Sequence, residues 1–195
     1  MFTSKRERNL WALAFLVTCT IFATLGIAQS LAHWLIDRDL IDATFGLGMF
    51  LVCGAILLLG IKARPSWLQV GIAAGIIAVY LIVFARMAIP EERSHLIEYS
   101  VLALLIFEAL RERKASGQTV LSNPCVWPFG KTLWWSGGLA FLISSSIGVL
   151  DEVVQFFIPG RVFDVRDIVF NVLASAMAVG GVLVLTQIRQ WQQSQ

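Results

Sequence analysis

Charged residues are scarce in this chain. Asp, Glu, Lys and Arg make up 14% of its 195 residues, whereas hydrophobic residues make up 57%. A soluble domain normally carries about a quarter charged residues, so this composition argues against a soluble protein. Alternation of polar and apolar residues with a period of two is absent as well, which argues against a transmembrane β-barrel. The net charge of +2 is too small to indicate a nucleic-acid partner.

Cysteine and histidine are also few, with three and two residues respectively. Cys19 and Cys53 fall inside apolar stretches and Cys125 lies in a predicted loop, so their spacing indicates neither a disulfide framework nor a metal site. The sequence shows no serine or cysteine nucleophile motif, no metal-ligand set and no phosphate-binding loop. We therefore predict no metal and no cofactor, and the sequence identifies no catalytic residue.

Long apolar blocks make up most of the chain. Several approach the roughly 20 residues with which a helix crosses a bilayer, and in lipid such blocks must be helical to pair their backbone groups. We predict an all-α fold, a polytopic bundle of about six transmembrane helices. The predicted helices cover residues 10–31, 43–61, 68–89, 95–110, 132–158 and 168–188. A cleaved signal peptide is the alternative for the first block, whose length favours a membrane helix.

Basic residues orient this bundle. With the N-terminus in the cytoplasm, most of the Lys and Arg residues fall in short cytoplasmic segments, as the positive-inside rule requires. These residues are Lys5, Arg6, Arg8, Lys62, Arg64, Arg111, Arg113, Lys114, Lys131 and Arg189. The outer segments hold Arg38, Arg93, Arg161 and Arg166. We predict that both termini are cytoplasmic.

Small residues in the last two predicted helices favour close helix packing in lipid. They include Gly137, Gly138 and Gly148 in one helix and Gly180 and Gly181 in the other. The alternative is that glycine is simply common in membrane helices.

Polar side chains gather near the outer ends of the predicted helices. Such groups are costly in hydrocarbon and need a partner or a wet cavity. The candidate site, called the polar cluster below, consists of His95, Glu98, Tyr99, Asp151, Glu152, Gln155, Arg161, Asp164, Asp167 and Asn171. Arg86 and Arg93 are candidate charge partners. One histidine among carboxylates is a weak signal for a metal, because no second histidine or cysteine accompanies it.

The acidic residues of the polar cluster fall into two pairs. Asp164 and Asp167 open the last helix with the spacing of N-cap and N3 residues, where capping alone explains carboxylates. Asp151 and Glu152 lie towards the C-terminal end of a helix, where the dipole disfavours negative charge. Asp151 lies roughly 10 Å from the end of its predicted helix, so we predict a functional or organising role for this pair. Glu108, at the cytoplasmic end, is interpreted as solvated surface charge.

Two segments resemble the VanZ-like membrane protein family. Residues 91–102 hold an acidic-basic pair, a histidine and a tyrosine four residues later, and residues 151–171 hold an acid-Glu-x-x-Gln, Pro-x-Arg, Asp and Asn series. Glu92 stands where the family usually has a lysine, so a role that needs lysine there is not carried over. On these motifs we divide the chain into residues 1–66, a two-helix region outside the resemblance; 67–190, a VanZ-like four-helix region; and 191–195, a short polar tail.

The resemblance implies a multi-pass protein of the bacterial cytoplasmic membrane. The family's named member is associated with low-level resistance to the glycopeptide teicoplanin, but no agreed reaction, substrate or cofactor accompanies the family. We predict that the polar cluster binds an amphiphile or lipid-linked envelope precursor, with membrane lipids as partners. Two alternatives stay open: an enzyme that acts on a lipid head group by carboxylate acid–base catalysis, and a small transporter. The sequence leaves the oligomeric state open.

Overall fold

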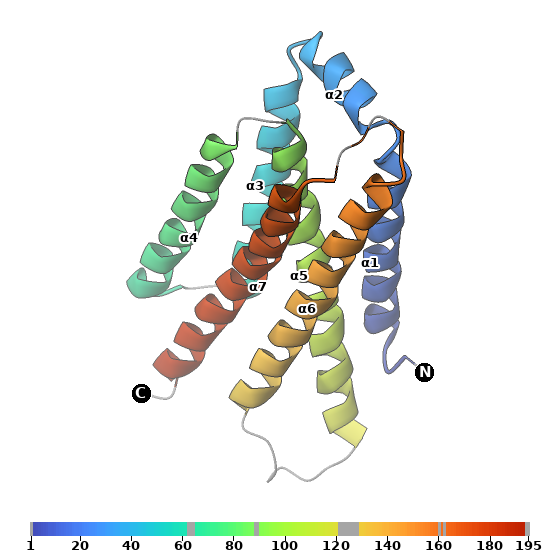
Figure 1. The fold of residues 1–195 in the computed structure, drawn as a ribbon. Helices are drawn as coiled ribbons and strands as arrows, with labels where there is room; N and C mark the ends of the chain where they lie inside the picture. Colours follow the sequence, from blue (N-terminus) through green and yellow to red (C-terminus); the bar gives the residue numbers. More distant parts are fainter. Residues whose placement is uncertain are drawn as a thin grey trace.

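A computed structural model describes residues 2–61, 65–87, 90–120, 129–159, 161 and 163–193. These residues form seven helices and no strand, which confirms the all-α prediction. The helices are α1 (Lys5–Thr24), α2 (Ala28–Ile36), α3 (Ile41–Gly60), α4 (Trp67–Arg86), α5 (Pro90–Val120), α6 (Phe129–Gln155) and α7 (Val165–Gln193), as labelled in Figure 1. The predicted loop around Cys125 lies outside the described residues.

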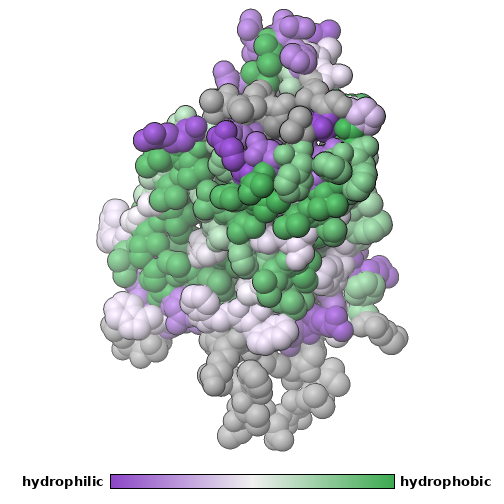
Figure 2. Space-filling view, viewed as in Figure 1, coloured by the Kyte–Doolittle hydropathy of each residue, from purple (hydrophilic) through white to green (hydrophobic). Residues whose placement is uncertain are grey.

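Four of these helices are long and apolar enough to cross a membrane: α3, α4, α6 and α7. α1 and α5 are not among them, because charged residues fill the first turn of α1 and are spread along α5. An apolar band crosses the middle of the face in Figure 2, with hydrophilic residues gathered above and below it. The chain is therefore a multi-pass membrane protein, as predicted.

The single helix predicted over residues 10–31 is in fact two helices. α1 ends at Thr24, residues 25–27 turn, and α2 then runs from Ala28 to Ile36. The backbone N–H of Ile27 donates to the carbonyl of Thr24 at 3.0 Å and closes this turn. Gly26 lies at its centre, and glycine costs a helix interior about 1 kcal/mol relative to alanine. The prediction missed the break because hydropathy does not fall there.

The first and last helices start and finish at the same end of the bundle, opposite the end that carries α2 (Figure 1). α5 is the central helix, packed against α1, α6 and α7, whereas α4 lies at the periphery and packs mainly on α7. Two ends on one side agree with an even number of crossings. The cytoplasmic location of that side stays a prediction.

Glycine allows α6 and α7 to approach closely at two positions. A Cβ on Gly148 would lie 2.6 Å from Cβ of Asn171, and one on Gly137 would lie 2.8 Å from Leu183. A Cβ on Gly138 or on Gly180 would have no neighbouring atom within 4 Å, so these two glycines are not required for the close approach of α6 and α7. Close packing therefore accounts for part of the small-residue pattern and not for all of it.

At the end that carries the termini, ion pairs join α1 to α5. Arg6 lies 3.3 Å from Glu108 and 3.3 Å from Glu112, and Arg111 lies 3.0 Å from Glu108. The side chain of Glu108 is only 6% exposed. The interpretation of Glu108 as solvated surface charge is therefore wrong, because α1 covers it.

Candidate functional site

The polar cluster is assembled from three helices and one connecting segment. α5 supplies His95, Glu98 and Tyr99, whose spacing places them on one face of its first turns. The last two turns of α6 supply Asp151, Glu152 and Gln155, and the first two turns of α7 supply Asp167 and Asn171. Arg161 and Asp164 belong to the segment between α6 and α7. The members that are buried are His95, Tyr99, Asp151, Glu152, Gln155 and Asn171.

Asp151 is fully buried and incompletely paired. Its Oδ2 accepts a hydrogen bond of 3.0 Å from the Tyr99 hydroxyl, and Nδ1 of His95 lies 3.9 Å from the same oxygen. Its Oδ1 has no hydrogen-bond partner among the described residues. An ionised carboxylate with one unpaired oxygen is destabilised in a buried site. A ligand that donates to this oxygen, or a proton on the carboxylate, would therefore stabilise Asp151.

Glu152 is also buried, and its carboxylate is held from two sides. Nε2 of Gln155 donates to Oε1 at 3.0 Å, and the backbone N–H of Asp164 donates to Oε2 at 3.3 Å. These bonds fix the orientation of the carboxylate. Its Oε1 then lies 4.0 Å from Nε2 of His95 on α5.

The two aspartates at the start of α7 have different surroundings. Asp164 is the residue before α7 and its Oδ1 accepts a hydrogen bond of 2.8 Å from the backbone N–H of Arg166, as a capping residue does. Asp167 faces the inside of the cluster instead, with Oδ2 3.7 Å from Nε2 of His95. Asp164 therefore caps the start of α7, whereas the side chain of Asp167 lies near His95 inside the cluster.

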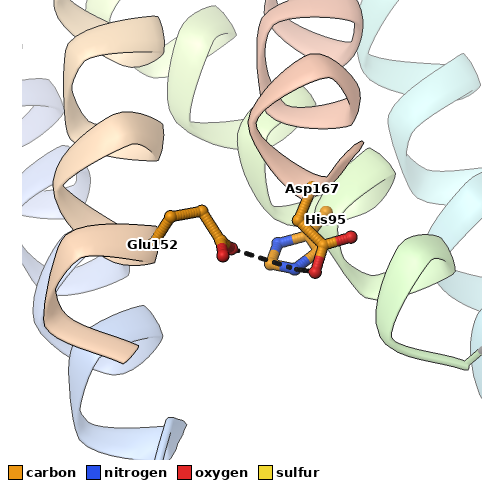
Figure 3. A group of neighbouring side chains, drawn as sticks. All are labelled: His95, Glu152 and Asp167. Atoms are coloured by element: carbon orange, nitrogen blue, oxygen red, sulfur yellow. Dashed lines mark ion pairs between the residues drawn. The ribbon is translucent and has the colours of Figure 1, made fainter. Parts of the chain in front are cut away.

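His95, Glu152 and Asp167 form the centre of the site, as Figure 3 shows. One ligand atom from each lies within 4.8 Å of the others, although the residues come from α5, α6 and α7. The distances of 3.7 and 4.0 Å from His95 Nε2 to the two carboxylates exceed hydrogen-bonding length. The side chain of His95 is 5% exposed and that of Asp167 is 17% exposed, so the group opens outwards along Asp167.

Positive charge inside the cluster comes mainly from Arg161. It attracts Glu98 and Asp151 electrostatically, and its buried Nε has no hydrogen-bond partner among the described residues. The other arginines near this end act elsewhere. Arg93 lies 2.9 Å from Asp42 and donates to the carbonyl of Met87, and Arg86 is exposed at the end of α4.

A second ion pair borders the cluster. Arg166 lies 3.2 Å from Glu92, whose side chain is 7% exposed, and this pair joins the start of α7 to the start of α5. Glu92 is therefore compensated without help from the cluster. The cluster contains five carboxylates (Glu98, Asp151, Glu152, Asp164 and Asp167) and a single guanidinium, so the cluster carries a net negative charge unless protons or cations are bound.

Hydroxyl and amide groups form the floor beneath this site. Nδ2 of Asn171 donates to the carbonyl of Gly148 at 3.2 Å, and the hydroxyls of Ser144 and Ser175 are 2.8 Å apart. Ser175 also donates to the carbonyl of Asn171 at 2.9 Å. Sequence reasoning counted Ser144 only among the small residues that favour close packing of its helix, and it assigned no role to Ser175. Serines among buried apolar residues could have indicated interhelical hydrogen bonds.

An apolar groove of about 610 Å³ lies between α4 and α7. Gly71, Gly75 and Tyr80 line it from α4, and Met177 and Gly180 line it from α7. The groove lies between two helices that are long and apolar enough to cross a membrane. Its volume and apolar lining suit a hydrocarbon chain.

The polar cluster lies closer to the helix end than the sequence indicated. α6 ends at Gln155 and residues 156–159 turn away, so Asp151 lies roughly 6 Å from the end of its helix rather than 10 Å. The estimate was too deep because the apolar residues Phe156, Phe157 and Ile158 extend the hydropathic block beyond the helix. The cluster is thus close to the end of α6, and most of its members are buried by protein.

These features define a multi-pass helical membrane protein with a buried, predominantly acidic site at one end of its bundle. The family model for VanZ/LLP1 matches residues 7–186, which is nearly the whole chain, so the protein belongs to this family. The match includes α1 and α3, although the motifs that carry the resemblance in the sequence lie in the second half. No curated protein and no solved structure shows significant similarity to the chain.

Proposed function

We propose that this protein binds the head group of a bacterial cell-envelope amphiphile at the outer leaflet of the cytoplasmic membrane. One observation carries the proposal: the buried carboxylate of Asp151 retains an unpaired oxygen at an end of a membrane bundle. Arg161, which interacts electrostatically with Asp151, is partly buried, and its buried Nε also lacks a partner among the described residues. Groups of both charges are thus available to a ligand that carries both.

The charge of the cluster indicates the class of head group. Five carboxylates around one guanidinium favour a head group with a positive charge, such as a primary ammonium. Arg161 supplies the donors that a phosphate oxygen needs. A zwitterionic phospholipid of the phosphatidylethanolamine type satisfies both requirements, whereas a purely anionic head group would be repelled by the acids.

The groove between α4 and α7 supports the same proposal. Hydrocarbon is the solvent on that face, and an acyl chain would fill a groove whose lining is almost wholly apolar. α7 contributes to both features, with Asp167 and Asn171 in the cluster and Gly180 in the groove. At 3.6 residues per turn the two sets lie on different faces of α7, so an amphiphile with its chain in the groove would pass over the start of α7 to bring its head group to the cluster.

Thermal unfolding in detergent tests the proposal. Wild type and the variant Asp151→Asn/Glu152→Gln are compared with added phosphatidylethanolamine or phosphatidylglycerol. We expect the zwitterionic lipid to raise the melting temperature of the wild type more than the anionic lipid does, because a ligand stabilises the state that it binds. The double variant should lose this difference while unfolding cooperatively.

Asp42→Asn serves as the matched control, because Asp42 is an exposed acid at the same end and outside the cluster. It should respond to lipid like the wild type. If the double variant is well folded and responds to both lipids as the wild type does, the polar cluster is not the binding site.

Carboxylate acid–base catalysis on a lipid head group is the second candidate function. The adjacent buried acids Asp151 and Glu152, held by Tyr99 and Gln155, favour it. Purified protein incubated with phosphatidylethanolamine should then release product, detected by mass spectrometry, and each single carboxylate variant should lose turnover. If the protein binds envelope lipids without converting them, the binding function is supported and the catalytic function is wrong.

Glycopeptide tolerance is the cellular consequence that we propose for this binding. Expression of the wild-type chain in a susceptible bacterium should raise the inhibitory concentration of teicoplanin, and the Asp151→Asn/Glu152→Gln variant should not. Equal membrane levels of the two proteins, measured by immunoblot, are the control. If expression of the wild type leaves the inhibitory concentration of teicoplanin unchanged, this member of the family does not confer glycopeptide tolerance.

A further inference from the structure

We infer that His95, Glu152 and Asp167 bind a divalent transition-metal cation such as zinc or manganese. One nitrogen and two carboxylate oxygens converge from three helices, with ligand atoms within 4.8 Å of one another (Figure 3). Imidazole and carboxylate are ordinary ligands for these metals. The inference concerns the same cluster as the proposed function but holds whether or not an amphiphile binds there.

The spacing of the three side chains fits a metal better than direct pairing. Nε2 of His95 is 3.7 Å from Asp167 and 4.0 Å from Glu152, too far for hydrogen bonds. Ligand atoms around a tetrahedral zinc ion are roughly 3.3 Å apart when each bond is about 2.0 Å long. The separations from His95 exceed this value by only about 0.4 Å for Asp167 and 0.7 Å for Glu152, and the partly exposed Asp167 has room to move.

The unpaired nitrogen of His95 is an independent indication. Nδ1 is buried, has no hydrogen-bond partner among the described residues, and lies 3.9 Å from Oδ2 of Asp151. A metal-binding histidine characteristically directs its other ring nitrogen at a carboxylate, which orients the ring. Asp151 occupies that position behind His95, and Tyr99 in turn orients Asp151 through its hydroxyl.

The remaining surroundings suit a cation. Glu152 is oriented by Gln155 and by the backbone of Asp164, as the outer partners of a metal ligand are. Asp151 and Asp167 both repel a negative charge on Glu152, and a dication would relieve that repulsion. Three protein ligands leave one position of a tetrahedral ion for water or for an oxygen of a ligand.

Metal binding is tested on tag-free, chelator-treated protein in a non-ionic detergent without added lipid. Zinc chloride and manganese chloride are titrated separately, and bound metal is measured by mass spectrometry after gel filtration. We expect about one equivalent of at least one of these metals per chain. His95→Asn, Glu152→Gln and Asp167→Asn should each weaken its binding about tenfold or more, because outer-shell changes alone cost 10–100-fold.

His33→Asn is the matched control, because His33 is the other histidine of the chain and lies on α2, outside the cluster. It should bind metal like the wild type. X-ray absorption of the metal-loaded wild type keeps the test valid if a variant fails to fold: one imidazole and oxygen ligands are expected. A sulfur ligand, more than one imidazole, no saturable binding, or unchanged binding in the three variants would overturn the inference.

The absence of lipid in this experiment separates the two proposals. If the protein binds metal but its stability does not respond to lipid, the metal site is supported and the amphiphile-binding proposal is wrong. If its stability responds to lipid but it binds no stoichiometric metal, the amphiphile-binding proposal is supported and the metal site is wrong.

Discussion

Tyr99 on α5 donates a 3.0 Å hydrogen bond to the fully buried carboxylate of Asp151 on α6. This contact joins the central helix of the bundle to the acidic pair that the sequence had marked as costly. It leaves one oxygen of Asp151 unpaired, so the carboxylate is oriented by the protein and still able to interact with something else.

Replacing Tyr99 with Phe should destabilise the protein, because a buried carboxylate then loses its neutral donor. Loss of one partner from a buried polar group costs about 1–3 kcal/mol, and the expected change in unfolding free energy lies in that range. Chemical denaturation in mixed micelles measures it. Thr18→Val, which removes a hydroxyl bonded at 2.9 Å to the carbonyl of Ala14 on α1, away from the cluster and from the groove, should leave the response to lipid unchanged; an altered response would contradict the assignment of the site.

Replacing Gly148 with Ala should weaken the α6–α7 contact. Its Cβ would lie 2.6 Å from Cβ of Asn171, which cannot move without shifting α7. Overpacking of this kind costs roughly 1–3 kcal/mol, measured as a loss of thermal stability. Gly138→Ala is the matched control, since nothing lies within 4 Å of its added Cβ. Equal effects of the two substitutions would mean that close packing at Gly148 is unimportant.

Filling the groove between α4 and α7 should reduce lipid binding while the cluster stays intact. Gly180→Leu places an isobutyl group where the groove is open, since nothing lies within 4 Å of its Cβ. We expect a smaller stabilisation by phosphatidylethanolamine and unchanged metal binding. Gly46→Leu, equally unobstructed and on α3 outside the groove, should respond like the wild type. A full lipid response in the Gly180 variant would show that the acyl chain lies elsewhere.

Residues near α2 should be accessible from outside the cell, and residues at the start of α1 should not. In a background without native cysteines, Asp37→Cys should react with a membrane-impermeant maleimide on intact cells. Asn9→Cys should react only after lysis. Both positions are exposed in the structure. The reverse pattern would invert the orientation and place the polar cluster in the cytoplasm.

The sequence specified the helices well where apolar runs coincide with them. α3 and α4 begin and end within a few residues of their predicted limits, because hydropathy and helix length agree there. It failed at Gly26, where the chain turns inside an apolar run, and at Phe156 to Ile158, which continue such a run beyond the end of α6. Hydropathy reports the preference for lipid, so it does not show a helix end that falls inside an apolar run.

The members of the polar cluster could be predicted, but their partners could not. Their common position near helix ends was visible in the sequence, because ionisable groups in apolar blocks are conspicuous. The approach of Asp167 to His95 depends on how α5 and α7 rotate against each other, so a capping role was equally reasonable for Asp167. The same limitation made a metal site look improbable, because its ligands are distributed over three helices.

The composition of α5 has a consequence for how the protein enters the membrane. Insertion of a charged residue at the centre of a lone helix costs about 2.5–3.5 kcal/mol, and α5 contains Glu98 and Glu108 between charged ends. Its neighbours α6 and α7 are synthesised after it, yet they pack against it along the cluster, whereas α1 covers Glu108. α5 is therefore held in the bilayer by its neighbours more than by its own hydropathy. In a chain truncated before α6, a cysteine introduced into the first turns of α5 should react faster with a water-soluble maleimide than it does in the full chain.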